Sequence, residues 1–78
     1  MKNLSNYEKQ RDLAEAELYN RIMSDPFFVT EFRTIYMRDG KHDAGFHLSE
    51  VASYRDIDNR EKIDYMEMAD LLYYDTNN

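Results

Sequence analysis

Four carboxylates near the end of the chain stand at spacings that suit a divalent cation. Asp56, Asp58, Asp64 and Glu67 occupy the first, third, ninth and twelfth places of one stretch of sequence. Calcium binds six to eight hard oxygen atoms, and a twelve-residue loop between two helices supplies them from such places, together with the fifth and the seventh. The chemistry that the sequence suggests first is therefore coordination of calcium by residues 56–67.

The same stretch departs from a working calcium loop at two places. Arg60 puts a fixed cation at the fifth position, where an oxygen ligand is needed. Glu61 replaces the glycine that lets the chain turn at the sixth position. We expect the Arg60 guanidinium to pair with the loop carboxylates in place of the ion. Calcium is then at most a weak ligand and no cofactor is required. The alternative is a charged turn followed by a capped helix, which needs no ion.

Loops of this kind, named EF-hands, occur in pairs, so a second loop is expected upstream. Residues 20–31 begin 36 residues before the first acid of the downstream loop. They carry Asn20 at the first position and Glu31 at the twelfth, and Phe27 falls on the apolar eighth position that corresponds to Ile63. This first loop is more degenerate than the second, because several of its ligand places hold apolar residues.

The helices that would position the two loops can be predicted from capping and turn signals. Ser5 and Glu8 form a capping box, which predicts a helix from there to about Tyr19. Residues 24–26 are typical of a turn. A second helix should follow and end at Gly40, since glycine readily closes the C-terminus of a helix.

A third and a fourth helix complete the expected domain. Residues 39–45 are predicted to be a polar linker, and the third helix should end near Arg55. Asp64 and Glu67 form another capping box, which begins the fourth helix. The chain of 78 residues is therefore expected to be a single all-α domain, residues 1–78, with four helices in two helix–loop–helix units.

Composition narrows the classes of function. Sixteen acids against ten bases give a net charge of −6, which argues against binding nucleic acid and favours a basic partner. The chain has no cysteine, and its apolar runs are too short for membrane insertion. With no signal peptide evident, we expect a cytoplasmic protein. His42 and His47 are five apart, which is not a helical metal pair, and no catalytic constellation is present. We expect no enzymatic activity.

With these features the chain resembles one lobe of the calmodulin, troponin C and myosin light chain superfamily. The segment Asp-Ile-Asp…Ile-Asp-Tyr-Met-Glu-Met, followed by Leu71 and Leu72, is the most similar part. The family usually has two lobes in one chain, whereas the resemblance here covers one. Within the family, this chain is therefore most similar in character to a single-lobe light chain of a class I myosin. The resemblance implies paired EF-hands, joined by a short two-stranded ribbon in which Phe27 meets Ile63. It also implies a groove for a target helix. The expected lining residues are Tyr19, Phe32, Ile35, Tyr36, Val51, Ile63, Met68, Leu71 and Leu72.

Myosin light chains hold the IQ segment of a heavy chain, often without calcium. The resemblance therefore implies a calcium-independent, calmodulin-like subunit of a motor protein that binds the basic amphipathic IQ-type helix of an unconventional myosin. One alternative is a single-lobe calcium sensor or buffer that uses residues 56–67. An alternative of another class is a small acidic helical inhibitor that mimics nucleic acid. The arrangement of the acids discriminates, because a mimic spreads them over exposed faces whereas a calcium loop gathers them.

Overall fold

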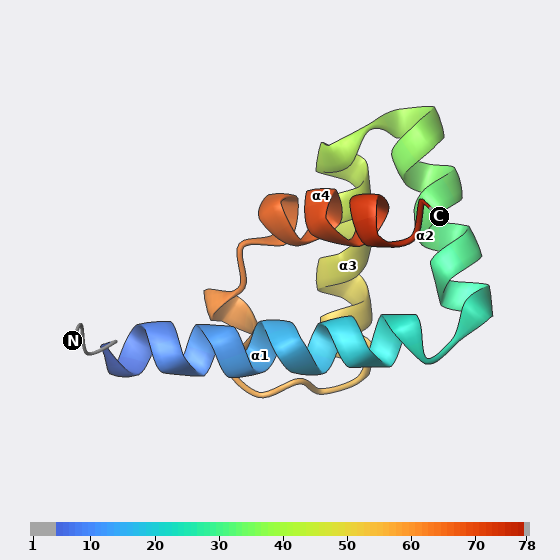
Figure 1. Ribbon diagram of the computed structural model, residues 1–78. Coiled ribbons are helices and arrows are strands. Elements are labelled where there is room, and N and C mark those ends of the chain that lie inside the picture. Colours follow the sequence, from blue (N-terminus) through green and yellow to red (C-terminus); the bar gives the residue numbers. More distant parts are fainter. Residues whose placement is uncertain (1–4, 78) are drawn as a thin grey trace.

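The computed structural model describes residues 5–77, and over this range the chain folds into four α-helices and one short 3-10 helix (Figure 1). The elements in chain order are α1 (Asn6–Met23), α2 (Pro26–Asp39), α3 (Lys41–Tyr54), η1 (Arg60–Lys62) and α4 (Tyr65–Asp75). The prediction of an all-α domain with four helices is confirmed. None of the helices within residues 5–77 has the length and apolar character needed to cross a membrane.

Helix α1 begins as its sequence predicts and ends later. The Ser5 hydroxyl accepts a hydrogen bond from the backbone N–H of Glu8 at 3.1 Å, as an N-cap should. The helix runs beyond Tyr19 to Met23, because its apolar stripe continues to the last turn. The buried residues of that stripe recur at intervals of four and are Ala14, Leu18 and Ile22.

The predicted first loop, residues 20–31, is wrong. Its beginning is the last turn of α1, its end is the first part of α2, and only Ser24 and Asp25 lie between the two helices. Asp25 Oδ1 accepts a hydrogen bond from the N–H of Phe27 at 3.0 Å and caps α2. Pro26 follows at the first helical position, where its missing N–H costs nothing. The predicted turn at residues 24–26 is present. No longer loop accompanies it, and the turn alone connects α1 to α2.

The predicted ribbon between Phe27 and Ile63 is absent, since residues 5–77 contain no β-strand. Phe27 lies in the first turn of α2 with 71% of its surface exposed, whereas Ile63 is only 6% exposed. Two residues in such different environments do not form a pair at the centre of a domain.

The predicted linker, residues 39–45, is also wrong. Gly40 alone separates α2 from α3, with φ of +93°, a backbone conformation that favours glycine. As predicted, Gly40 ends α2, and its N–H donates to the Tyr36 carbonyl. The polar stretch that follows is helical because Ala44 and Gly45 are buried. A Cβ on Gly45 would lie 3.1 Å from the Tyr65 carbonyl oxygen, so α4 passes close to α3 at this point.

Between α3 and α4 the chain makes an irregular loop, residues 55–64, that contains η1. Asp56 and Asn59 adopt positive φ values of 55° and 60°. Ile57 turns inward and is 1% exposed. Asp64 then accepts a hydrogen bond from the N–H of Glu67 at 3.1 Å and caps α4, which confirms the predicted start of that helix.

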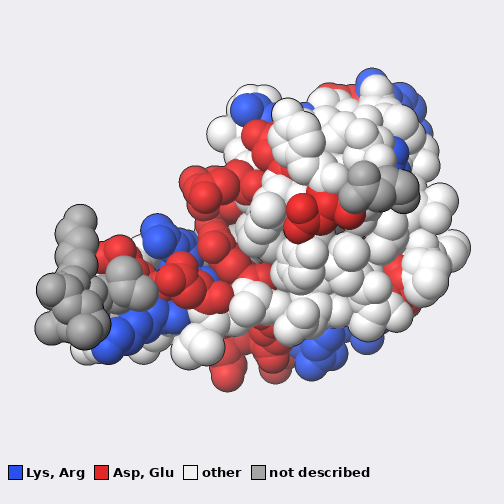
Figure 2. Space-filling view, in the orientation of Figure 1, with Lys and Arg blue, Asp and Glu red and all other residues white. Residues whose placement is uncertain are grey.

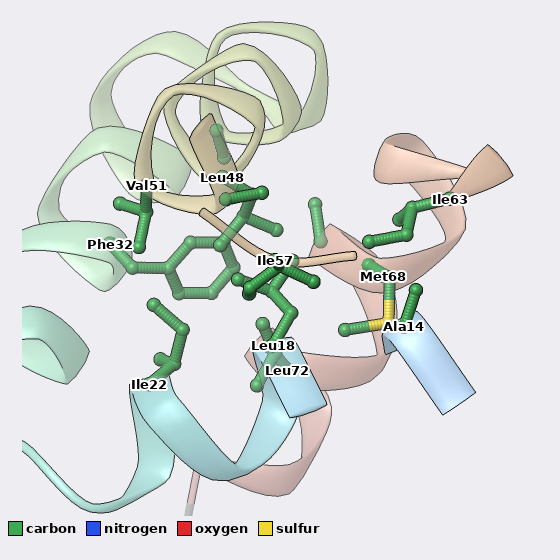
Figure 3. Close-up of a cluster of buried hydrophobic side chains, with 13 residues drawn as sticks. Ala14, Leu18, Ile22, Phe32, Leu48, Val51, Ile57, Ile63, Met68 and Leu72 are labelled. Atoms are coloured by element: carbon green, nitrogen blue, oxygen red, sulfur yellow. The ribbon is translucent and has the colours of Figure 1, made fainter. Parts of the chain in front are cut away.

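The core lies where α1, α3 and α4 meet, with Phe32 of α2 and Ile57 of the loop inserted among them (Figure 3). In Figure 1, α4 lies above α1, and the N-terminal half of α1 extends beyond the other helices. The fully or almost fully buried apolar residues are Ala14, Leu18, Ile22, Phe32, Ala44, Leu48, Val51, Ala52, Ile57, Ile63, Met68, Ala69 and Leu72.

Candidate functional site

Most of the residues predicted to line a target-binding groove form the closed core in this structure. Five of them are at most 6% exposed, namely Phe32, Val51, Ile63, Met68 and Leu72. Tyr19, Ile35 and Tyr36 are half-buried and pack against that core. Leu71 is 48% exposed and turned away from it. The nine residues therefore do not line a common open groove.

Two tyrosines among these nine residues, Tyr19 and Tyr36, form hydrogen bonds to α4. The Tyr36 hydroxyl donates to Asp70 at 2.7 Å, and its ring stacks on Tyr73 with 4.0 Å between the ring centroids. The hydrogen bond to Asp70 favours the neutral phenol and raises the pKa of Tyr36 to about 12. The Tyr19 hydroxyl donates to Asp75 at 2.9 Å, which raises the pKa of Tyr19 for the same reason.

The carboxylates of the predicted calcium loop make different contacts and do not converge on one point. Arg60 donates to Asp56 Oδ1 at 3.3 Å and to the Ile57 carbonyl at 3.1 Å, so the predicted pairing of Arg60 with a loop carboxylate is present. Asp64 is occupied as the N-cap of α4. Within residues 5–77 no three Asp, Glu or His side chains converge in a way that would hold a metal ion.

Contacts with α1 hold this loop in place. Glu15 accepts a hydrogen bond from the N–H of Asp64 at 3.2 Å. Partial burial raises the pKa of Glu15, against the lowering effect of that hydrogen bond. Lys62 lies 5.5 Å from the centre of the Tyr7 ring and also donates to Gln10. Figure 2 shows acidic side chains over the junction between α1 and the start of α4.

A different surface, between α2 and α3, carries two hollows. One hollow of about 510 Å³ is lined by Phe28, Glu31, His47, Glu50, Val51, Tyr54 and Arg55. A second of about 560 Å³ is lined by Phe27, Thr30, Glu31, Thr34, Ile35, Arg38 and His47. We name the two together the α2–α3 groove. Of the predicted target-binding residues, only Val51 and Ile35 take part in it.

The polar contacts of the α2–α3 groove lie at its middle and at one end. Nε2 of His47 lies 3.2 Å from a carboxylate oxygen of Glu31, and it has no partner in hydrogen-bonding geometry within the described chain. The Arg55 guanidinium stacks over Phe28, 5.1 Å from the ring centroid. Tyr54 is 93% exposed at the rim. The lining of the groove therefore combines apolar side chains, two carboxylates, two arginines and exposed aromatic rings.

The sequence does carry a signal for this surface that the loop interpretation obscured. Phe27 and Glu31 are four residues apart, and His47, Glu50, Val51 and Tyr54 recur at intervals of three, one and three. Such intervals place side chains on one face of a helix. Assigning residues 20–31 to a loop removed Phe27 from any helical face and so hid the pattern.

No protein-family model, curated protein or solved structure matches this chain.

Proposed function

We propose that this protein is a non-catalytic, calcium-independent binding module that holds a basic amphipathic helix of a partner protein in the α2–α3 groove. The observation that carries the proposal is the groove itself, of which one hollow is lined by apolar side chains and by one carboxylate from each wall. Grooves between helices are a recurrent site for amphipathic helices, whose apolar side chains enter the groove.

The apolar part of the groove supplies the driving force. Phe28, Val51 and the exposed ring of Tyr54 line one hollow, and Ile35 and the exposed ring of Phe27 line the other. Each Å² of apolar surface that a partner removes from water contributes about 25 cal/mol. Exposed aromatic rings are favourable contact residues, because they bury a large area and lose little conformational entropy.

The charges favour a basic partner. Glu31 of α2 and Glu50 of α3 line the groove, and neither forms an ion pair with a Lys or Arg within residues 5–77. Two arginines line it as well, but Arg38 is paired with Asp39 and the Arg55 guanidinium lies over a phenylalanine ring. The net charge of −6 adds a long-range attraction for a cationic segment. A helix with Lys or Arg beside its apolar face would complement both the groove and the protein as a whole.

Calcium independence follows from how the groove is built. Its walls belong to α2 and α3, and side-chain and backbone groups of the protein cap the ends of α2. The loop at residues 56–67 contributes no lining residue. The IQ-type helix of an unconventional myosin heavy chain is the narrower form of this proposal. The expectation of an IQ-type helix rested on two paired loops, and the first of these is not formed. An IQ-type peptide is therefore only one of the peptides used to test the proposal.

The test is direct binding of defined peptides, measured by fluorescence anisotropy in EGTA and again in calcium. A labelled basic amphipathic helical peptide and an IQ-type peptide should bind equally well in both buffers. A peptide of the same composition in shuffled order, without an amphipathic face, should bind weakly. Absence of binding by both helical peptides would overturn the proposal, and binding only in calcium would overturn its calcium-independent part.

Two exposed tyrosines provide a matched pair of variants that locate the bound helix. Tyr54→Ala removes a ring at the groove and Tyr74→Ala removes one on α4, where the ring is 73% exposed. We expect Tyr54→Ala to weaken binding about fivefold, as for a contact of about 1 kcal/mol, and Tyr74→Ala to leave it unchanged. Equal effects of the two changes would place the bound helix elsewhere.

A second candidate is a small acidic inhibitor that mimics nucleic acid. The observation in its favour is that the acids of residues 56–67 do not converge, and that the Asp56 side chain is 93% exposed. Competition with duplex DNA for a basic DNA-binding domain tests it, with salt dependence as the second measurement. Displacement of the DNA that weakens steeply with salt and is unaffected by Tyr54→Ala would favour this candidate.

A further inference from the structure

The two hollows of the α2–α3 groove share a boundary. Glu31 and His47 line both of them, whereas every other lining residue belongs to only one. The Glu31–His47 pair, with its 3.2 Å separation, therefore divides the groove into two compartments of similar volume. Each compartment is large enough for a leucine or an aromatic side chain.

The charges follow this division. One carboxylate, that of Glu31, lies at the boundary between the hollows, and an arginine lines each hollow separately. Arg38 is already paired with Asp39 at 2.7 Å, and Arg55 lies over Phe28. Glu31 has no Lys or Arg partner among the described residues, so the boundary is a place where an added positive charge is stabilised, and the hollows on either side of it are the places for apolar groups.

We propose that the partner helix places one large apolar side chain in each hollow and a Lys or Arg between them, against Glu31. This inference rests on the proposed function and specifies the order of groups on the bound helix as apolar, basic, apolar. It differs from the usual amphipathic arrangement, in which the basic residues flank the apolar face from outside.

Helix geometry allows this arrangement. Residues seven or eight apart lie on one face of a helix, with a rise of about 1.5 Å for each residue. A basic residue three or four positions from either anchor lies on the same face as both. The Glu31 side chain is 42% exposed, so it can meet a cation from solvent without leaving its place beside His47.

The experiment uses capped helical peptides in which two leucines stand seven or eight residues apart, with lysine or glutamine between them, three or four positions from each leucine. They are measured against the full chain and against Glu31→Gln. Glu17→Gln is the matched control, because it makes the same change in charge at an exposed position of α1. We expect the lysine peptide of one spacing to bind about threefold tighter than its glutamine counterpart, the effect of a partly exposed ion pair.

The expected result is that Glu31→Gln removes this preference and Glu17→Gln retains it. If Glu31→Gln and Glu17→Gln retain the lysine preference equally while the leucine peptides still bind, the inference is overturned and the proposed function stands. If neither spacing binds with lysine or with glutamine, and the basic amphipathic peptide also fails, both are overturned.

Discussion

Replacing Asp25 by alanine distinguishes a capped helical turn from a calcium-type loop at the junction of α1 and α2. Asp25 has an extended backbone, with φ of −128° and ψ of 102°, which alanine adopts without strain. Its carboxylate accepts one hydrogen bond, from Phe27 N–H at 3.0 Å. Asp25→Ala therefore removes the cap and little else, and the loss of such a cap costs about 1 kcal/mol of the free energy of unfolding.

Urea unfolding followed by far-ultraviolet circular dichroism measures this cost. With a slope of about 1 kcal/mol per molar urea for a small domain, the midpoint should fall by about 1 M. Asp25→Asn is the matched control, because asparagine caps almost as well as aspartate. Its midpoint should stay close to that of the unchanged chain.

The loop interpretation predicts the opposite order of effects. It places residue 25 at the position that requires glycine, so Asp25→Gly would stabilise the protein and Asp25→Ala would change little. The capped turn predicts that Asp25→Gly costs a few tenths of a kcal/mol and that Asp25→Ala costs more. An alanine variant as stable as the asparagine variant would refute our account of this turn.

Two further changes test the contacts of α4. Gly45→Ala gains about 1 kcal/mol in helix propensity but brings a Cβ to 3.1 Å from the Tyr65 carbonyl oxygen, and overpacking costs about 1–3 kcal/mol. We expect a net loss of about 1 kcal/mol in urea unfolding, and a stabilised variant would show that the helices are not so close. In an absorbance titration of the phenols, Tyr36 should ionise only near pH 12, because it donates to Asp70. Since its pKa in the folded chain exceeds the usual value of about 10, its stabilising contribution is complete below pH 10 and is lost as the pH rises toward 12. Asp70→Asn should bring this ionisation to lower pH, and an unchanged titration curve would contradict the assignment.

The parts of the fold that depend on adjacent residues could be predicted from the sequence. The caps at Ser5 and Asp64 and the end of α2 at Gly40 are each determined within one turn of a helix, and all three are present. The pairing of Arg60 with a carboxylate of its own loop could also be predicted, because the sequence puts its cation among them, but the choice of Asp56 over Asp58 and Glu67 could not.

The first loop could not be rejected on its ligand pattern alone. A match of residue types at fixed intervals does not test whether the backbone is extended or helical. The stronger signal was the apolar stripe of α1, which ends at Ile22 with no exposed surface. Because Ile22 belongs to this stripe, residues 20–23 continue the helix and do not begin a loop. Asp25 and Pro26 then begin the next helix immediately.

The linker and the groove were missed because each depends on distant packing. Residues 41–45 are polar enough for a loop, but contact with α4 makes Ala44 and Gly45 part of a buried helical face. Whether Phe32 and Leu72 line an open groove or close a core depends on how α4 lies over α3. Local periodicity shows which face of a helix is apolar, and it does not show what covers that face.

The single-residue connection at Gly40 also affects the order in which the protein assembles. The two walls of the α2–α3 groove are consecutive in the chain, so bringing them together closes almost no loop and costs little chain entropy. By contrast, the contacts between α1 and α4, such as that of Tyr19 with Asp75, join residues 56 positions apart. Low contact order favours early formation. The surface proposed to bind the partner can therefore begin to form on the ribosome before the last helix has been synthesised.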